Sequence, residues 1–295
     1  MVTWNDRLSG AGLVELERLV ERCQQADRSR CLSEELLLRL RKGTGDTWAS
    51  WVPGAEGWSG YAQLHLTGQG AWGELLVDPS ARRQGLGRHL LDACVQGARE
   101  RGASHLDVWC FGDHEGGARL SRSLGFAPLR RLLFLVRALD SLPPLQPGPI
   151  RLDPFDGSRD VSAWMALHRS VQPDPTRAWS EEDLQLRLAE PWFDPSLLRL
   201  ARLDEQAIGY LWLKHHALQT EGELFRMAVA PAMQGRGLGR YLVTWALHEL
   251  AWRRALTASV FVSSSNEAAC RLYQSLGFRT HASDCCYRRE LAADL

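Results

Sequence analysis

Apolar and polar positions in the second half of the chain follow a pattern that predicts alternating strands and helices. Two apolar-rich runs, Leu198 to Leu203 and Ala207 to His215, flank a short polar turn and predict an antiparallel hairpin. Glu223 to Val229 predicts the next strand. From Arg236 to Arg253 the apolar residues recur at helical spacing, and Leu256 to Val262 then predicts a buried strand.

A second helix is predicted from Asn266 to Leu276. It ends at Gly277, because glycine readily takes the left-handed conformation that closes a helix. The order of elements is hairpin, strand, glycine turn, helix, strand, helix, strand, and the first half shows the same order. This order predicts an α/β fold.

An internal repeat divides the chain into two similar halves. Three blocks recur at a constant offset of 152 residues: 76–79 and 228–231, 82–88 and 234–240, and 119–126 and 271–278. Separate blocks in one register indicate the duplication of a unit of about 150 residues. Between the copies, 139–149 contains four prolines and one glycine, which is typical of an extended linker. We therefore expect an N-terminal domain over residues 1–140, a linker over 141–149 and a C-terminal domain over 150–295.

Composition narrows the class of protein. The chain has 295 residues, of which 45% are hydrophobic and 24% are charged, as in ordinary globular domains. Its 35 basic and 35 acidic residues balance, which favours a small-molecule substrate over nucleic acid. No apolar run approaches the roughly 18 residues of a membrane span, and the N-terminus shows no secretory signal. We expect a cytoplasmic monomer that does not bind membranes.

The cysteines and histidines do not predict a metal site. The seven cysteines contain no C-x-x-C pair, and we expect them to be reduced thiols. His215 and the next histidine would point to opposite faces of a strand, so we expect no metal there.

The turn after the strand that ends at Val229 has the features of an anion cradle. A Q-x-x-G-x-G sequence runs from Gln234 into a helix, whose first N–H groups have no partner within the helix. Glycines let the backbone approach a phosphate closely, which predicts pyrophosphate binding. A tight strand-to-helix turn without a ligand is the alternative.

This turn, followed by Asn266-Glu267-Ala268-Ala269 and Leu272-Tyr273-x-x-x-Gly277-Phe278, resembles the signature of the GNAT acetyltransferase superfamily. The resemblance implies two tandem GNAT domains, each a mixed, mostly antiparallel twisted sheet flanked by helices, and acetyl-CoA as co-substrate. The implied acetyl-CoA contacts are Met227, Ala228, Val229, Gln234, Gly235, Arg236, Gly237, Leu238, Gly239, Arg240, Asn266, Glu267, Ala268, Ala269, Cys270 and Arg271. The corresponding residues of the first half are Leu75, Leu76, Val77, Arg82, Arg83, Gln84, Gly85, Leu86, Gly87 and Arg88.

Three further segments, 192–195, 209–214 and 222–223, resemble the mycothiol synthases, a tandem branch of the superfamily. Members acetylate the cysteinyl amine of a cysteine–glucosamine–inositol conjugate. This resemblance implies acceptor contacts from Glu34, Asp174, Trp212, Lys214, Glu223 and Phe261. The segment 168–173 departs from the pattern, since it lacks the asparagine and His-Pro of that family's acceptor loop.

Acetyl transfer to an amine needs a base and an acid, which the resemblance assigns to Glu223 and Tyr273. A carboxylate can take the proton of an ammonium whose pKa is near ~8, and a tyrosine with a pKa near ~10 stays protonated and can donate to the leaving thiolate. A backbone N–H near Val229 would polarise the thioester carbonyl. The structural alternatives are a solvated charge for Glu223 and a packing residue for Tyr273.

The first half lacks this pair, and we expect it to be non-catalytic. At the constant offset, Ser121 replaces Tyr273 and Ala71 replaces Glu223. Glu74 lies three residues along, which would turn it to the other face of the strand unless a bulge intervenes. Two other functions stay open for the chain: acetylation of another small amine or a peptide N-terminus, and a non-catalytic acetyl-CoA-binding module.

Overall fold

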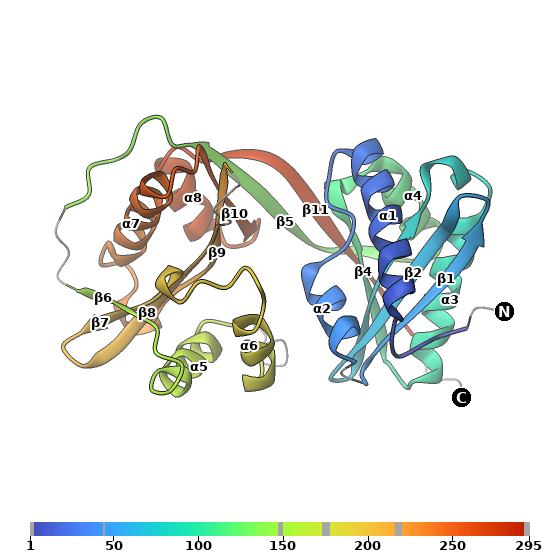
Figure 1. The fold of residues 1–295 in the computed structure, drawn as a ribbon, viewed down its shortest axis with the longest axis horizontal. Coiled ribbons are helices and arrows are strands. Elements are labelled where there is room, and N and C mark those ends of the chain that lie inside the picture. Colours follow the sequence, from blue (N-terminus) through green and yellow to red (C-terminus); the bar gives the residue numbers. More distant parts are fainter. Residues whose placement is uncertain (1–2, 44, 147–149, 173–177, 216–219, 292–295) are drawn as a thin grey trace. The chain divides into compact units, whose positions relative to one another are not determined.

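The computed structural model describes residues 3–291 except 44, 147–149, 173–177 and 216–219. It divides into two compact units (Figure 1). Unit 1 comprises residues 1–131 and 283–295, and unit 2 comprises residues 132–282. No described helix is both long enough and apolar enough to cross a membrane.

Unit 1 is a sheet with helices on both faces. Its helices are α1 (Gly10–Asp27), α2 (Glu34–Lys42), α3 (Leu86–Glu100) and α4 (Glu115–Ser123), and its strands β1 (Thr47–Gly54), β2 (Gly57–Thr67), β3 (Gly70–Val77) and β4 (His105–Cys110). β1, β2 and β3 are antiparallel neighbours, and β4 runs parallel to β3. Helices α1 and α2 pack on one face, and α3 and α4 pack on the other.

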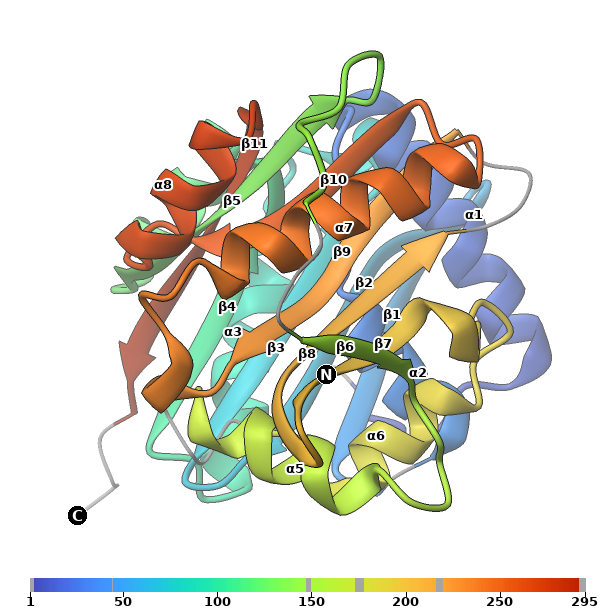
Figure 2. The same cartoon turned by 90° about the vertical axis from the view of Figure 1, so that its left-hand side faces the viewer.

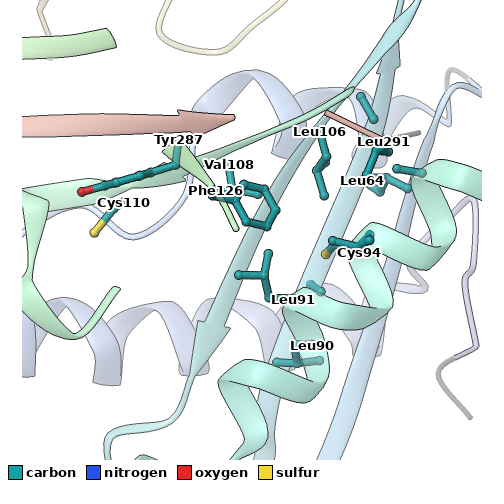
Figure 3. Close-up of a cluster of buried hydrophobic side chains, with 14 of the residues drawn as sticks. Leu64, Leu90, Leu91, Cys94, Leu106, Val108, Cys110, Phe126, Tyr287 and Leu291 are labelled. Carbon is teal, nitrogen blue, oxygen red and sulfur yellow. The ribbon is translucent and has the colours of Figure 1, made fainter. Parts of the chain in front are cut away.

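Local sequence sets the limits of these helices. Ser33 caps α2 by accepting the backbone N–H of Leu36, and Gly43 ends the helix at a φ of 66°. In the cluster of Figure 3, Leu90, Leu91 and Cys94 of α3 face Leu106 and Val108 of β4. Apolar residues at i, i+1 and i+4 of α3 thus bury one stripe against the sheet.

The C-terminal end of the chain completes the sheet of unit 1. Residues 285–290 of β11 (Arg279–Glu290) pair with β4 in antiparallel register. Tyr287 joins the hydrophobic cluster of Figure 3, and the Arg288 guanidinium binds both Asp107 carboxylate oxygens at 2.6 and 2.9 Å. This segment is therefore part of the core of unit 1.

Unit 2 repeats the arrangement. Its helices are α5 (Val161–Ser170), α6 (Glu181–Leu188), α7 (Leu238–Trp252) and α8 (Glu267–Ser275), and its strands β6 (Arg151–Pro154), β7 (Leu198–Leu203), β8 (Gln206–His215), β9 (Glu221–Val229) and β10 (Thr257–Ser263). Residues 132–138 of β5 (Ala127–Ala138) pair with β10. Figure 2 shows α7 running across β9 and β10; α8 packs on the same face as α7, and α5 and α6 cover the other. The predicted order of hairpin, strand, helix, strand and helix is confirmed.

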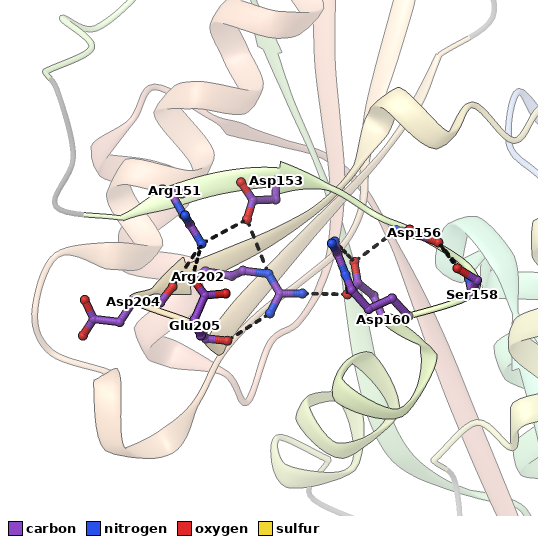
Figure 4. A network of polar contacts seen from close by, with 9 residues as sticks. Arg151, Asp153, Asp156, Ser158, Asp160, Arg202, Asp204 and Glu205 are labelled. Atoms are coloured by element: carbon purple, nitrogen blue, oxygen red, sulfur yellow. Dashed lines mark hydrogen bonds and ion pairs between the residues drawn. The ribbon is translucent and has the colours of Figure 1, made fainter.

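An ionic network holds β6 and the start of α5 to the hairpin of β7 and β8 (Figure 4). The Arg202 guanidinium lies 2.6 Å from the buried Asp160 carboxylate and 3.4 Å from Asp153, and it donates to the Glu205 carbonyl at 3.2 Å. The hydrogen bonds and charges of Arg159 and Arg202 hold the pKa of Asp160 below its usual range.

The compact units differ from the ranges expected from the repeat. The expected boundary lay at 140–150, whereas the units divide at 131/132 and assign the last residues of the chain to unit 1. The reason is that β5 and β11, each 12 residues long, begin in one unit and end in the other. Each sheet thereby receives its final strand from the other copy of the repeat.

Candidate active site at an opening in the sheet of unit 2

The candidate site is the place where β9 and β10 separate. Their parallel pairing covers only residues 221–223 and 257–259. In the described chain, β9 continues to Val229 without pairing to β10 beyond this point. The backbone groups of Met227, Ala228 and Val229 on that side are therefore available to an extended ligand. Unit 1 opens in the same way, because β3 and β4 pair only over 71–73 and 106–108.

A β-bulge marks the opening in unit 2. Trp212 lies opposite Arg226 and Leu213 lies opposite Leu224, so Phe225 has no partner on β8. A bulge of this kind adds one residue to a strand and bends it. The pairing of β2 with β3 in unit 1 has no such shift.

Because of the bulge, the residue of unit 1 that corresponds to Glu223 is not the one expected from the constant offset. Glu223 lies opposite Lys214 and beside Ser259, and the residue of unit 1 with the same two neighbours is Trp72, not Ala71. The constant offset was wrong here because β9 contains one residue more than β3. Glu74 is two residues from Trp72 and therefore lies on the same face of the sheet as the position of Glu223.

The turn that follows β9 is open at the N-terminus of α7. Gly235 and Gly237 have φ angles of 75° and 81°, and a Cβ atom at either would meet no atom within 4 Å. Gly237 caps α7 without a side-chain hydrogen bond. The first N–H groups of α7 thus face open space, which is the geometry of an anion site. Gly239 has a different role, since its Cβ would lie 3.2 Å from the Leu272 side chain of α8.

The same turn in unit 1 has the same backbone and different side-chain contacts. Arg83 adopts a φ of 64° at the position of Gly235, and Gly85 caps α3 at 87°. The Arg82 guanidinium, expected to contact acetyl-CoA, binds both carboxylate oxygens of Asp27 at 2.6 and 2.8 Å and the Val77 carbonyl at 3.1 Å. The side-chain amide of its counterpart Gln234 donates to the equivalent carbonyl, that of Val229, at 3.0 Å.

Tyr273 lies beside the opening. Its side chain is 5% exposed and belongs to a cluster with Leu224 of β9 and Val260 of β10, and its ring packs edge-on against Phe278. Burial raises the pKa of the Tyr273 hydroxyl above its usual range. Within the described residues this hydroxyl has no hydrogen-bond partner. A protonated donor on a largely buried side chain is thus left for a ligand.

Glu223 stands at the closed end of the same opening, as the last residue of β9 that pairs with β10. Leu224 points into the cluster that contains Tyr273, so alternation along the strand turns Glu223 to the α5 and α6 face. There it faces Lys214, whose Nζ lies 4.3 Å from the centroid of the Trp192 ring. The structure therefore brings the two predicted catalytic residues to one break in the sheet.

The other expected acceptor residues lie on several different elements. Phe261 is half-buried on β10 and stacks on Phe134 at 4.7 Å. Trp212 is 0% exposed in an aromatic cluster with Trp164 and Phe225, which makes its side chain part of the core. Glu34 is the exposed first residue of α2 in unit 1, and Asp174 lies outside the described residues.

Sequence reasoning did not identify the buried polar groups of the α5 and α6 face. His168 is 0% exposed; its Nε2 accepts the backbone N–H of Trp179 at 3.3 Å, and its Nδ1 lies 3.0 Å from the Tyr210 hydroxyl. Burial lowers the pKa of His168 to about 4, and the charge of Arg226 contributes. The helical spacing of Trp164 and His168, i and i+4, was the available signal.

Comparisons with known proteins agree with this geometry. The profile of the Acetyltransferase (GNAT) family matches residues 13–126 and 164–278. A mycothiol acetyltransferase of Thermomonospora curvata is 38% identical over 97% of both chains, and one of Streptomyces griseus is 34% identical over 97% of this chain and 94% of that protein.

Solved structures show the same fold. A tandem GNAT protein from the clavulanic acid biosynthesis pathway superposes with a TM-score of 0.75 at 15% identity over 99% of both chains. A GCN5-related N-acetyltransferase from Sphaerobacter thermophilus gives 0.72 at 22% identity, covering 94% of this chain and 92% of that one. With two matched copies of the family profile and two open sheets of the same design, the chain belongs to the GNAT acetyltransferase family as a tandem-domain member.

Proposed function

We propose that unit 2 transfers the acetyl group of acetyl-CoA to the cysteinyl amine of a cysteine–glucosamine–inositol conjugate, the last step in making mycothiol. The observation that carries the reaction type is the Tyr273 hydroxyl, which belongs to a 5% exposed residue and has no hydrogen-bond partner in the described chain. It lies beside the opening at whose end Glu223 pairs with β10. The full-length similarity to proteins named mycothiol acetyltransferase supports the choice of acceptor.

The residues around the opening fit acetyl-CoA. The unpaired edge of Met227 to Val229 would bind the extended pantetheine arm, and the start of α7, which has no side-chain cap, would bind the pyrophosphate. The open space at Gly235 and Gly237 lets the backbone approach the phosphates. When bound there, acetyl-CoA supplies the thioester that donates the acetyl group.

Glu223 and Tyr273 would handle the protons. Glu223 takes one from the acceptor ammonium, directly or through a water molecule, and so leaves a free amine to attack. Tyr273 donates one to the sulfur of the leaving thiol, and its raised pKa keeps it protonated at neutral pH. A backbone N–H at the edge of β9 would stabilise the negative charge that develops on the carbonyl oxygen.

We infer that unit 1 is not catalytic. Trp72 and Ser121 stand where unit 2 has Glu223 and Tyr273. Unit 1 keeps the open sheet and the uncapped helix, which supports binding of acetyl-CoA without turnover. In the acceptor site of unit 2, the half-buried candidates are Lys214, Glu223 and Phe261. Glu34 stays a candidate from unit 1, and we propose that the protein acts as a cytoplasmic monomer.

The first experiment follows release of the CoA thiol when the protein is given acetyl-CoA and the conjugate, with the product mass checked for one N-linked acetyl group. Tyr273→Phe is the sharpest variant, because removal of an unpartnered hydroxyl should leave stability unchanged within about 0.5 kcal/mol. We expect it to lower kcat by roughly 10²-fold. Unchanged kcat would refute the role of Tyr273.

Glu223→Gln tests the base. The loss in kcat/KM should be largest at acid and neutral pH and shrink as free amine becomes abundant at high pH. A loss independent of pH would make Glu223 a binding residue. If the conjugate is not turned over while acetyl-CoA binds, the acceptor is another amine or a peptide N-terminus; if no amine is turned over, the chain is a binding module.

A further inference from the structure

The one cysteine that is not buried lies on the cofactor side of α8. All seven cysteines fall in the described residues; six are buried, and Cys270 is half-buried. Cys270 follows the helix cap Asn266 by four residues and precedes Tyr273 by three, so the three side chains share one face of α8. The Cys270 sulfur lies 3.6 Å from the Ser263 carbonyl at the end of β10. This thiol therefore borders the opening between β9 and β10.

Packing places the thiol beside the same cluster as the unpaired edge of β9. Cys270 and Met227, one from α8 and one from the unpaired edge of β9, pack against the cluster that contains Tyr273. The charge of Cys270 contributes to the raised pKa of the Tyr273 hydroxyl, after the larger effect of burial. That hydroxyl belongs to a residue that is 5% exposed and has no hydrogen-bond partner in the described chain, and so it marks where a ligand sulfur belongs.

Unit 1 offers no equivalent thiol. Ala118 stands 152 residues before Cys270. Cys110 at the end of β4 is buried, and burial raises its pKa to about 11. Cys23, whose sulfur donates to the Val77 carbonyl at 3.4 Å, is buried as well. A reagent directed by the nucleotide cradle could enter either unit, yet only unit 2 would present it with an accessible thiol.

We propose that Cys270 is a thiol–disulfide exchange site for disulfides of coenzyme A, and that the resulting mixed disulfide blocks acetyl transfer. This inference rests on the proposed binding of acetyl-CoA to unit 2. The disulfide of coenzyme A has the same nucleotide and pantetheine arm as acetyl-CoA, so the cradle and the edge of β9 would bring its sulfur–sulfur bond to the position of the thioester.

The exchange needs no further oxidant. Cys270 loses its proton to solvent, and its sulfur attacks one sulfur of the disulfide. The sulfur–sulfur bond breaks, one coenzyme A stays bonded to Cys270, and the other leaves as a thiolate that takes up a proton. A small thiol reverses the reaction by attacking the mixed disulfide, which restores Cys270.

The test treats the full-length protein with coenzyme A disulfide and measures intact mass. We expect one adduct per chain, located on Cys270 by peptide mapping, removed by dithiothreitol and prevented by excess coenzyme A. Pantethine, which carries the same disulfide arm without the nucleotide, should react at least roughly tenfold more slowly, because it lacks the contacts that raise the effective concentration. Acetyl transfer should fall in proportion to the adduct.

Cys270→Ala is the matched variant, since Ala118 shows that the fold accepts alanine at the equivalent position. Each protein is compared with its own untreated rate and with its own coenzyme A affinity by calorimetry. The variant should form no adduct. Adduct formation on another cysteine, or none on Cys270 while coenzyme A binds, would overturn the inference and leave the proposed function standing. Absence of coenzyme A binding would overturn both.

Discussion

Glu74 of unit 1 is a buried carboxyl whose protonation should control stability. Its side chain is 1% exposed, and one oxygen, Oε2, accepts the Ser33 backbone N–H at 2.9 Å and the Gln63 side-chain amide at 2.7 Å. The other oxygen, Oε1, is buried without a partner in the described chain. Burial raises the pKa of Glu74 to about 7, although these hydrogen bonds and the charge of Arg30 oppose the shift.

The raised pKa sets both the sign and the size of the effect. The folded state favours the neutral Glu74 carboxyl. The contribution of Glu74 to the free energy of unfolding is therefore complete below about pH 4.5 and is lost as the pH rises to about 7. A shift of about 2.5 pH units corresponds to roughly 3 kcal/mol, since one unit is about 1.4 kcal/mol. Glu74→Gln keeps an acceptor for Ser33 and removes the charge, so this variant should not show the loss.

Urea unfolding of both proteins between pH 5 and 8.5 measures the difference. The variant should match the natural protein within about 1 kcal/mol near pH 5 and be more stable by up to roughly 3 kcal/mol above pH 7. Hydrogen exchange at the start of α2, where Ser33 donates to Glu74, should report the same change. A difference that does not depend on pH, or a variant less stable at pH 8 than at pH 5, would contradict this reasoning.

His168 of unit 2 should have the opposite pH dependence. Its pKa is lowered to about 4, so roughly 3 kcal/mol of stability is lost as the pH falls from about 6.5 toward 4. In urea unfolding at acid pH, His168→Gln should reduce this dependence of stability on pH. Asp107→Asn should lower the free energy of unfolding by roughly 2 kcal/mol. This is less than the loss of a fully buried ion pair, because the Arg288 side chain is 28% exposed. An unchanged urea midpoint would argue against a stabilising Asp107–Arg288 ion pair. Gly237→Val should add about 1–2 kcal/mol of backbone strain, because the residue has a φ of 81°. Calorimetry should show coenzyme A binding to unit 2 at least roughly tenfold weaker. Gly85→Val is the control, and it should affect only a site in unit 1.

The acid and base candidates come from the resemblance to the family, and each lies in an element that the sequence predicts. Tyr273 is fixed by the helix that runs to Gly277, and Glu223 by the strand that leads into the glycine turn. Their presence at one opening depends on where β9 and β10 stop pairing, which neither strand encodes alone. The constant offset gave the wrong counterpart for Glu223, Ala71, because the bulge at Phe225 adds one residue to β9.

The sequence by itself determined the duplication, the order of elements and the glycine turn, because periodicity and backbone freedom act over a few neighbouring residues. Tertiary structure alone decided which sheet each final strand completes: residues 132–138 pair with β10, whereas residues 285–290 pair with β4. It also decided the ionisation of Glu74 and His168. Both outcomes depend on burial and on partners distant along the chain, such as Asp107 for Arg288, and no local pattern contains that information.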